Sequence, residues 1–356
     1  MYIRRKKLYL LVGVFSIIVF YSFIGNGKGL PYPIPELKLF PPLPYTDNIP
    51  TVKGVELGRF LFYDTILSID SSFSCGSCHI QKFAFSDSPN QFSSGINGKK
   101  MDRNTPPLFN LPWYSSLFWD GKAKSIEEQV FHPVAAHDEM NLDWKTATKR
   151  IQSSRFYRKK FSEVFGQQTI DSILIAKAIG QFERILISNN SKYDKVINGD
   201  DYFTKDEYTG FVIINEQNRG DCLHCHTTDA DALGTNTLFS NNGLDNFSSP
   251  KDYIDKGKAT ITKNDNDLGW FKIPSLRNIE VTGPYMHDGR FQTLEEVIDF
   301  YSEGVKMSYN IDSKMGYAHQ GGVQLNDLEK KQVIAFLKTL TDTAFLTNPE
   351  FSNPYK

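Results

Sequence analysis

All four cysteines of the 356-residue chain occur in two short strings of the form Cys-x-x-Cys-His. The strings are Cys75-Gly-Ser-Cys78-His79 and Cys222-Leu-His-Cys225-His226. This spacing is the attachment signature of a c-type haem, in which both thiols add to the haem vinyl groups and the histidine becomes the proximal iron ligand. A zinc site would need a completed set of four ligands, and four cysteines are too sparse here for a disulfide framework. The pattern therefore predicts two covalently bound haem c groups.

The charged residues nearly cancel, since 40 Lys and Arg face 41 Asp and Glu and give a formal net charge of −1. A nucleic-acid partner would call for an excess of basic residues, so we expect none. The length suits two domains of ordinary size, each able to bury an apolar core.

The first 29 residues have a separate role. Four basic residues at positions 4–7 precede an uncharged apolar run of 17 residues, 8–24. Basic residues stay on the cytoplasmic side, so the rest of the chain is expected in the periplasm, where c-type haem is attached. The run is long enough to span a membrane and no small-x-small cleavage site follows it. We therefore favour an anchor retained in the inner membrane over a cleaved signal peptide.

A proline-rich segment, residues 30–50, comes next. Five prolines fall between residues 31 and 42, and Pro44 follows. This density excludes a helix and predicts an extended tether, or a strap over the first domain.

The remaining chain looks like a degenerate duplication of one haem-binding unit, with domains at 51–195 and 196–345. We expect a mainly α fold of two cytochrome c-like haem domains with long loops, preceded by the signal or anchor helix. Apolar residues at helical spacing predict helices at 55–63 and 206–214 before the two cysteine strings, and a long core helix at 170–188. Capping boxes at 293–296 and 326–329 each predict the start of a further helix.

From about Leu57 to Thr341 the chain resembles the bacterial dihaem cytochrome c peroxidases and their MauG-type relatives. The motifs that carry this resemblance are Leu57-Gly-Arg-Phe-Leu-Phe-Tyr-Asp-Thr-Ile-Leu-Ser, Arg103-Asn-Thr-Pro-Pro, Phe118-Trp-Asp-Gly, Ile273-Pro-Ser-Leu-Arg-Asn and Gly283-Pro-Tyr-Met-His-Asp-Gly. The resemblance implies that the first haem reacts with hydrogen peroxide. It also implies that the second haem relays electrons from a small c-type cytochrome or a similar donor.

Two residues match the family's distal groups at the first haem. Glu139 is expected to move a proton from the near to the far peroxide oxygen, and Gln129 to orient the bound oxygen species. The alternative is that both are ordinary solvated polar residues. Typical members carry a histidine some sixteen residues after the first Cys-x-x-Cys-His, but residues 80–131 contain none. Unless Met101 or a more distant group substitutes, we expect the first haem to be five-coordinate at rest.

The second haem departs from the usual peroxidase pattern too. Family peroxidases have a methionine ligand fourteen residues after the histidine of His-Asp-Gly, whereas counting fourteen from His287 reaches Tyr301. MauG-type enzymes have tyrosine there, and an anionic phenolate lowers the potential of the iron. The alternative is that Tyr301 packs in the core while Met307, Met315 or His319 binds the iron.

The resemblance assigns further residues to the space between the haems. Trp119 matches a tryptophan that passes electrons between the two irons. Asn104, Thr282 and Pro284 match a calcium site, and oxygen donors of this kind suit a hard cation.

Three functions are compatible with these residues. The favoured one is a dihaem peroxidase that reduces hydrogen peroxide to water. The second is a MauG-like oxidase that stores two oxidising equivalents over both haems and modifies a protein or organic substrate. Tyr301 supports this second function, but Gly220 stands where MauG has a substrate-facing tryptophan. The third, an electron carrier without enzymatic activity, is disfavoured by Glu139. The sequence leaves open whether the chain forms a homodimer.

Overall fold

The computed structural model describes residues 29–166, 169–217, 219–227 and 233–356. The apolar run at 8–24, predicted to be an anchor or signal, lies outside these residues. Within the described part, no helix is both long enough and apolar enough to cross a membrane.

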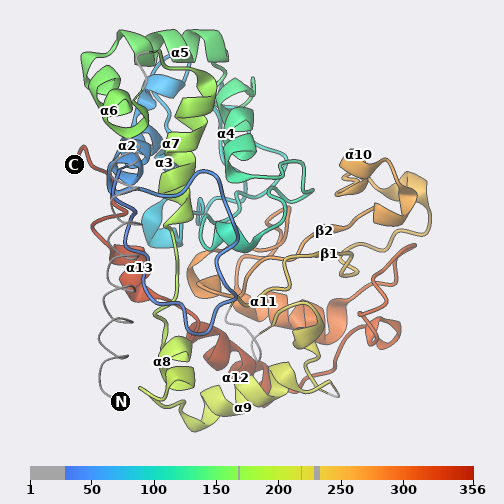
Figure 1. Ribbon diagram of the computed structural model, residues 1–356. Coiled ribbons are helices and arrows are strands. Elements are labelled where there is room, and N and C mark those ends of the chain that lie inside the picture. Colours follow the sequence, from blue (N-terminus) through green and yellow to red (C-terminus); the bar gives the residue numbers. More distant parts are fainter. Residues whose placement is uncertain (1–28, 167–168, 218, 228–232) are drawn as a thin grey trace, which may run out of the picture.

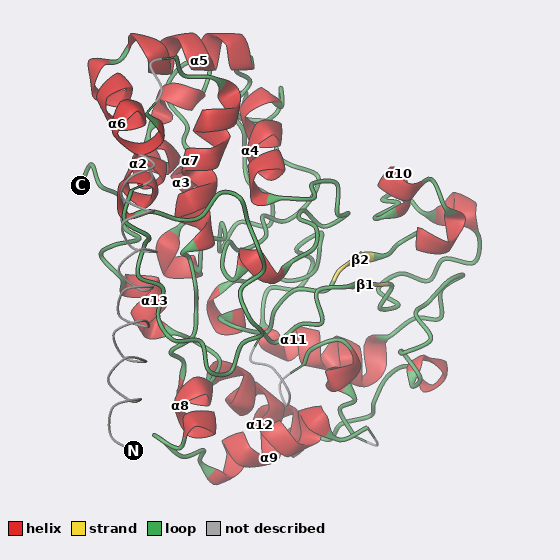
Figure 2. Ribbon diagram, viewed as in Figure 1, coloured by secondary structure: helices red, strands yellow, loops and turns green. Residues whose placement is uncertain are grey.

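Helices supply nearly all of the regular structure, and one antiparallel pair of short strands supplies the rest (Figures 1 and 2). The mainly helical class predicted from the sequence is therefore confirmed. The elements are α2 (Val52–Tyr63), α3 (Cys75–Cys78), α4 (Ile126–Ala135), α5 (Trp144–Ser153), α6 (Arg155–Phe165), α7 (Ser172–Arg184), α8 (Lys192–Asn198), α9 (Lys205–Asn215), β1 (Phe239–Ser240), α10 (Ala259–Thr262), β2 (Phe271–Lys272), α11 (Leu294–Asp299), α12 (Asp327–Lys338) and α13 (Thr343–Thr347).

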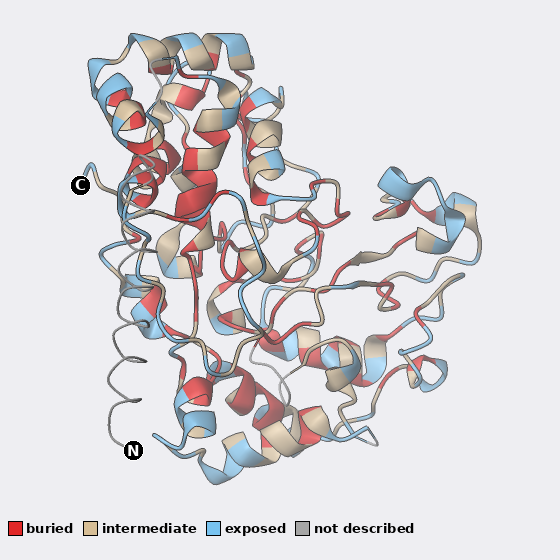
Figure 3. Cartoon of the chain, viewed as in Figure 1, coloured by how far each residue is buried: buried red, intermediate tan, exposed pale blue. Residues whose placement is uncertain are grey.

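Two large apolar clusters form the interior (Figure 3). The first lies among α2, α4, α5, α6 and α7, and the second among α8, α9, α11 and α12. The chain passes from one to the other between Leu186 and Tyr193, so the predicted boundary at residue 195 lies inside α8. After α12 the chain returns to the first cluster, where Phe345 and Phe351 are buried.

Both clusters contain the same kind of helix crossing. In the first, α2 packs on α7 and Gly58 faces the carbonyl oxygen of Ala178 and the Cβ of Phe182. In the second, α9 packs on α12 and Gly210 faces the carbonyl oxygen of Gln332 and the Cβ of Phe336. A Cβ at either glycine would collide with that carbonyl, so both crossings require glycine. Each of the two clusters thus contains a helix pair that crosses at a glycine.

The proline-rich segment spans both clusters. Tyr32 packs against the first cluster, whereas Leu39 and Phe40 pack against the second. The ring of Phe40 lies 5.1 Å from that of Trp113, whose Nε1 donates a 3.0 Å hydrogen bond to the Pro41 carbonyl. The segment is thus a strap over both halves and not over the first one alone.

A buried ion pair joins α8 to the loop after β2. The Arg277 Nη1 and Nη2 atoms lie 2.9 and 2.5 Å from the two carboxylate oxygens of Asp194, and neither side chain is more than 3% exposed. Burial alone would raise the pKa of Asp194, but the Arg277 charge and its hydrogen bonds hold that pKa below its ordinary value. The guanidinium also stacks over the ring of Phe40, 4.9 Å from its centroid, so the pair also anchors the strap.

Replacing Arg277 with methionine should destabilise the protein by about 3–5 kcal/mol, because it leaves the Asp194 carboxylate buried without its cation. Urea unfolding of the haem-loaded protein measures this change. Lys338→Met is the matched control, since it breaks the exposed Lys338–Glu280 pair at 3.9 Å and should cost about 0–1 kcal/mol. Equal destabilisation by the two variants would contradict a structural role of the buried pair.

Candidate haem-binding sites

The first cysteine string forms a single helical turn whose geometry prepares His79 for a metal. Cys75 and Cys78 lie at the two ends of α3, and Ser74 and Ser77 cap its start. The Nδ1 atom of His79 lies 2.7 Å from the carbonyl oxygen of Phe85, so the ring proton sits on Nδ1 and the Nε2 lone pair is left for iron. Burial lowers the pKa of His79, which keeps the imidazole neutral at pH 7.

The second string repeats this arrangement with a tighter turn, Cys222–His224. The Nδ1 atom of His226 lies 3.3 Å from the carbonyl oxygen of Gly234. Burial lowers the pKa of His226 to about 4, so this ring is also neutral and its Nε2 can bind a metal.

The surroundings of the second string fit covalent haem better than the alternatives. All four cysteines are unpaired, and the described residues contain no group of three His, Cys, Asp or Glu side chains that could hold a metal by themselves. A cavity with an empty volume of about 1670 Å³, partly open to solvent, adjoins Cys222, Cys225 and His226. Its lining is mostly apolar, as a flat porphyrin requires. These residues would hold a haem through two thioethers and one histidine.

At the first site, the Glu139 carboxylate lies close enough to the haem-attachment cysteines for its charge to act on them. The carboxylate is partly buried and makes no hydrogen bond or ion pair with any described residue. Its charge nevertheless acts on both Cys75 and Cys78. Burial raises the pKa of Glu139, and the positive charge of Lys122 opposes this rise. Gln129, the other predicted distal residue, projects from α4 and is also partly buried.

The loop 93–99 holds the backbone that carries Glu139. The Ile96 N–H donates a 3.0 Å hydrogen bond to the Glu139 carbonyl oxygen, and the Asn97 side chain donates one of 3.2 Å to the His137 carbonyl. Gly95 lies so close that a Cβ there would collide with the carbonyl oxygen of Asp138. This is the region that lacks the expected histidine.

A second carboxyl group lies at the first site. Glu183, near the end of α7, is 3% exposed, and its Oε2 atom has no hydrogen-bond partner among the described residues. Burial raises the pKa of Glu183 to about 8, and its charge is felt at Cys75. The site therefore contains a neutral buried acid at pH 7.

Tyr301 lines the same cavity as His226 and the second cysteine pair. It lies in a π-helical turn, Phe300–Gly304, that interrupts the predicted helix after α11. Such turns often occur at functional sites. The Tyr301 hydroxyl accepts a 2.9 Å hydrogen bond from the Asn242 side chain, and burial raises the pKa of Tyr301 to about 12.

The alternative ligands at the second site differ in position. Met315 lines the cavity together with Tyr301. Met307 is 55% exposed, and His319 is exposed with its Nδ1 atom 2.8 Å from the Gly316 carbonyl. Neither Met307 nor His319 lines the cavity, so Tyr301 and Met315 are the candidates that the structure brings to it.

Residues predicted to lie between the haems come together at the edge of this cavity. The buried Trp119 donates a 2.8 Å hydrogen bond from Nε1 to the Asn104 carbonyl oxygen, and the Asn104 N–H donates one of 2.7 Å to His287. Thr282 and Pro284 line the cavity alongside Asn104 and Trp119. The three residues predicted for calcium thus line one cavity, and they offer neutral oxygen atoms, which suit that ion.

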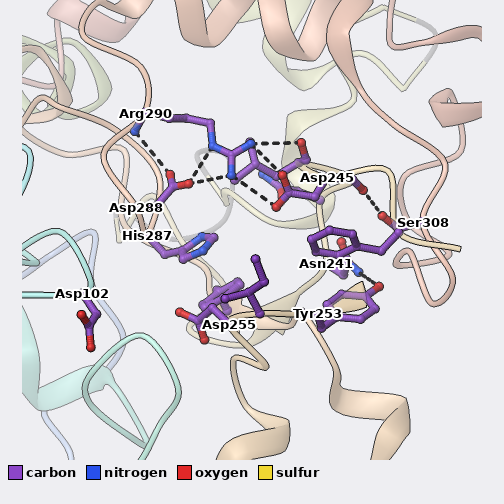
Figure 4. Close-up of a pocket in the computed structure, with 15 residues that line it drawn as sticks. Asp102, Asn241, Asp245, Tyr253, Asp255, His287, Asp288, Arg290 and Ser308 are labelled. Atoms are coloured by element: carbon purple, nitrogen blue, oxygen red, sulfur yellow. Dashed lines mark hydrogen bonds and ion pairs between the residues drawn. The ribbon is translucent and has the colours of Figure 1, made fainter. Parts of the chain in front are cut away.

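A second pocket, with an empty volume of about 790 Å³ that includes solvent-open space, shares a wall with this cavity (Figure 4). His287 and Phe271 belong to both, and their rings stack 3.6 Å apart. At its rim, Arg290 bridges Asp288 and Asp245 at 2.7 and 2.9 Å. A small molecule bound here would contact His287, which also lines the cavity of the second cysteine string.

Sequence analysis missed several residues that the structure places at these sites: Glu183, Asn242, Lys272 and Met286. Lys272 directly precedes the Ile273-Pro-Ser-Leu-Arg-Asn motif. A lysine next to this motif was the one sequence signal that pointed to Lys272 as a site residue. Glu183 and Asn242 offered no comparable signal.

Comparisons with known proteins agree with this geometry. Residues 52–202 match the family model described as di-haem cytochrome c peroxidase. The chain is 30% identical over 303 residues to the methylamine utilization protein MauG of Methylophilus methylotrophus, covering 84% of this chain and 85% of that protein. It is 33% identical over 300 residues to the cytochrome c551 peroxidase of Nitrosomonas europaea, covering 84% and 82%. The crystal structure of a MauG-like protein associated with microbial copper homeostasis superposes with a TM-score of 0.82 at 32% identity, covering 91% of this chain and all of that one (100%).

These similarities extend over both cysteine strings and most of the chain. They confirm the family predicted from the motifs, and with it an oxidoreductase that uses haem. The chain belongs to the family of di-haem cytochrome c peroxidases and MauG proteins.

Proposed function

We propose that this protein is a peroxidase that reduces hydrogen peroxide to water at its first haem. Electrons would come from a small c-type cytochrome and enter through the second haem. The observation that carries the proposal is the Glu139 carboxylate, which is partly buried, has no hydrogen-bond partner in the described chain and lies within electrostatic reach of Cys75 and Cys78. A carrier that only transfers electrons has no use for such a group.

When bound, the first haem would supply an iron centre for peroxide and the electrons that break its O–O bond. The protein's part is proton movement. A Glu139 carboxylate oxygen takes the proton from one peroxide oxygen and returns it to the other, so that the departing oxygen leaves as water. Gln129 would orient the peroxide by hydrogen bonding, and the loop 93–99 would keep Glu139 in place.

Trp119 lies in the hydrogen-bonded contact that links Asn104 to His287, and we assign it the transfer of electrons between the haems. The calcium ion would be held by Asn104, Thr282 and Pro284. The export signal predicted at the N-terminus supports a periplasmic location, with residues 8–24 anchored in the inner membrane.

The MauG-like function is the second candidate. It is favoured by the Tyr301 hydroxyl in the second cavity and by the neighbouring pocket that shares His287 (Figure 4). A phenolate ligand makes the second haem a poorer acceptor of electrons from a high-potential cytochrome. The pocket offers a place for an organic substrate beside that haem.

Glu139→Gln should abolish rapid peroxide-dependent oxidation of a reduced small cytochrome c by the purified diferric enzyme, without pre-reduction. A loss of about 10²–10⁴-fold is expected, because glutamine cannot take up and return the proton. In the wild type the rate should fall at low pH, since the proton acceptor must be ionised and burial raises the pKa of Glu139.

Glu128→Gln is the control, since Glu128 is exposed on α4 next to Gln129. It should keep wild-type turnover. Absence of turnover in the wild type, with oxidation of an added organic substrate in its place, would favour the MauG-like function.

Gly95→Ala should slow the reaction with peroxide while leaving both haems attached. The added Cβ must push the Asp138 carbonyl away and so displace Glu139. Stopped-flow measurement of the first haem's absorbance after mixing with peroxide gives the rate. Gly98→Asn is the matched control, because Gly98 has a φ of +69° and open space around it, and asparagine tolerates such a backbone. Equal rates for Gly95→Ala and wild type would contradict the positioning role of the loop.

Tyr301→Met should raise the reduction potential of the second haem, because a neutral thioether replaces an anionic phenolate. Potentiometric titration followed by absorbance measures it, and the ferric EPR spectrum should change as well. Tyr285→Phe removes another hydroxyl from the same cavity and should change neither. If Met315→Leu altered the EPR spectrum and Tyr301→Met did not, Met315 would be the ligand.

A further inference from the structure

Lys272 is a buried cation that has no anionic partner among the described residues. It is the second residue of β2 and lines the cavity beside Cys222, Cys225 and His226, with only 8% of the residue exposed. Its Nζ atom lies 4.3 Å from the ring centroid of Tyr114. This Nζ atom makes no hydrogen bond or ion pair with any residue that the structure describes.

An ammonium group in this position is costly unless a negative charge compensates it. A cation–π contact with one tyrosine offsets only part of the lost hydration. Burial lowers the pKa of Lys272 to about 8 and no neighbouring carboxylate raises it again, yet at neutral pH the amine still carries its proton. The cavity therefore contains a positive charge that no negative charge of the described residues compensates.

Two carboxylates in adjoining segments already form ion pairs. Asp120 follows Trp119, and Asp255 lies in the loop that leads towards β2. Both are held by Arg103, at 2.8 and 2.7 Å. They form a complete cluster of their own, and no described residue supplies an anion to Lys272. A group bound in the cavity is therefore the candidate partner.

The cysteines and histidine in the same cavity identify its occupant as the second haem. Its negatively charged groups are two propionate carboxylates, which lie together on one edge of the porphyrin. The backbone N–H of Lys272 donates a 2.8 Å hydrogen bond to the Trp119 carbonyl oxygen, which fixes the backbone of Lys272 next to that of Trp119. Both side chains line the cavity. We propose that the Lys272 ammonium group binds a propionate of the second haem and fixes that edge of the haem beside Trp119. This assignment rests on the presence of the second haem and not on any reaction with peroxide.

The assignment has an electrostatic consequence. A positive charge beside the haem favours the reduced iron, which carries one positive charge fewer. Lys272 thus acts in the opposite direction to a Tyr301 phenolate and limits how far that ligand lowers the potential. Lys272 would therefore both position the second haem and adjust its potential, at the haem edge assigned to Trp119.

Potentiometric titration of the haem-loaded enzyme, without peroxide, tests the proposal. Lys272→Met should shift the second haem to a more negative potential and leave the first haem unchanged. Lys314→Met is the matched control, because Lys314 lines the same cavity but is exposed, so its charge is screened by water. A potential unchanged by Lys272→Met, or shifted no further than by Lys314→Met, would overturn the proposal.

Two further measurements test the proposal even if the Lys272→Met variant loses its haem. Lys272→Arg retains the charge and should keep both haems, counted by the pyridine haemochrome assay, with a potential nearer to wild type. A crystal structure of the wild-type holoenzyme needs no variant at all. It should place the Lys272 Nζ within about 4 Å of a propionate oxygen, the usual limit for an ion pair. An Nζ atom that contacts only Tyr114 or water would overturn the assignment even if the enzyme proved to be an active peroxidase.

Discussion

The close crossing of two helices at a glycine is the constraint on which each half of the molecule depends. At Gly58 and Gly210 the backbone of one helix rests directly on a carbonyl of the other, and the next contact in each case is a phenylalanine Cβ. Such a crossing fixes the helix that leads into each cysteine string against a second helix, and the other helices of each half pack around this pair.

Two buried titratable side chains have no hydrogen-bond or ion-pair partner among the described residues. Among the described residues, the Glu183 Oε2 atom buried at the first site has no hydrogen-bond partner, and Lys272 buried at the second site has no anion. Folded proteins rarely leave buried polar groups unpartnered, so exceptions call for an explanation. Both residues lie beside the cysteine strings, where the family implies that haem is attached. The Arg277–Asp194 pair, by contrast, is complete and serves to tie the strap and α8 to the second half.

Helix starts were the most predictable part of the fold. The capping boxes at Thr293 and Asn326 are both present, because a capping box depends only on residues three positions apart. The end of the helix after Thr293 was less predictable: it passes into a π turn at Phe300, so Tyr301 lies in that turn and faces the cavity. Packing against distant segments decides such a change, and no local pattern encodes it. The same reason explains why the strap was expected on one half but lies on both.

The sequence by itself determined the cofactor, its number and the family, because haem attachment requires thiols and a histidine within five consecutive residues. Through the resemblance to the family it also predicted Glu139 as a distal residue and, by counting fourteen residues from His287, Tyr301 as a ligand. Only the tertiary structure decided that Met307 and His319 lie away from the second cavity while Met315 remains at it. It alone revealed that the loop 93–99 holds Glu139 and that Lys272 is buried. Burial and the absence of a partner are properties of segments far apart in the chain that meet only after folding.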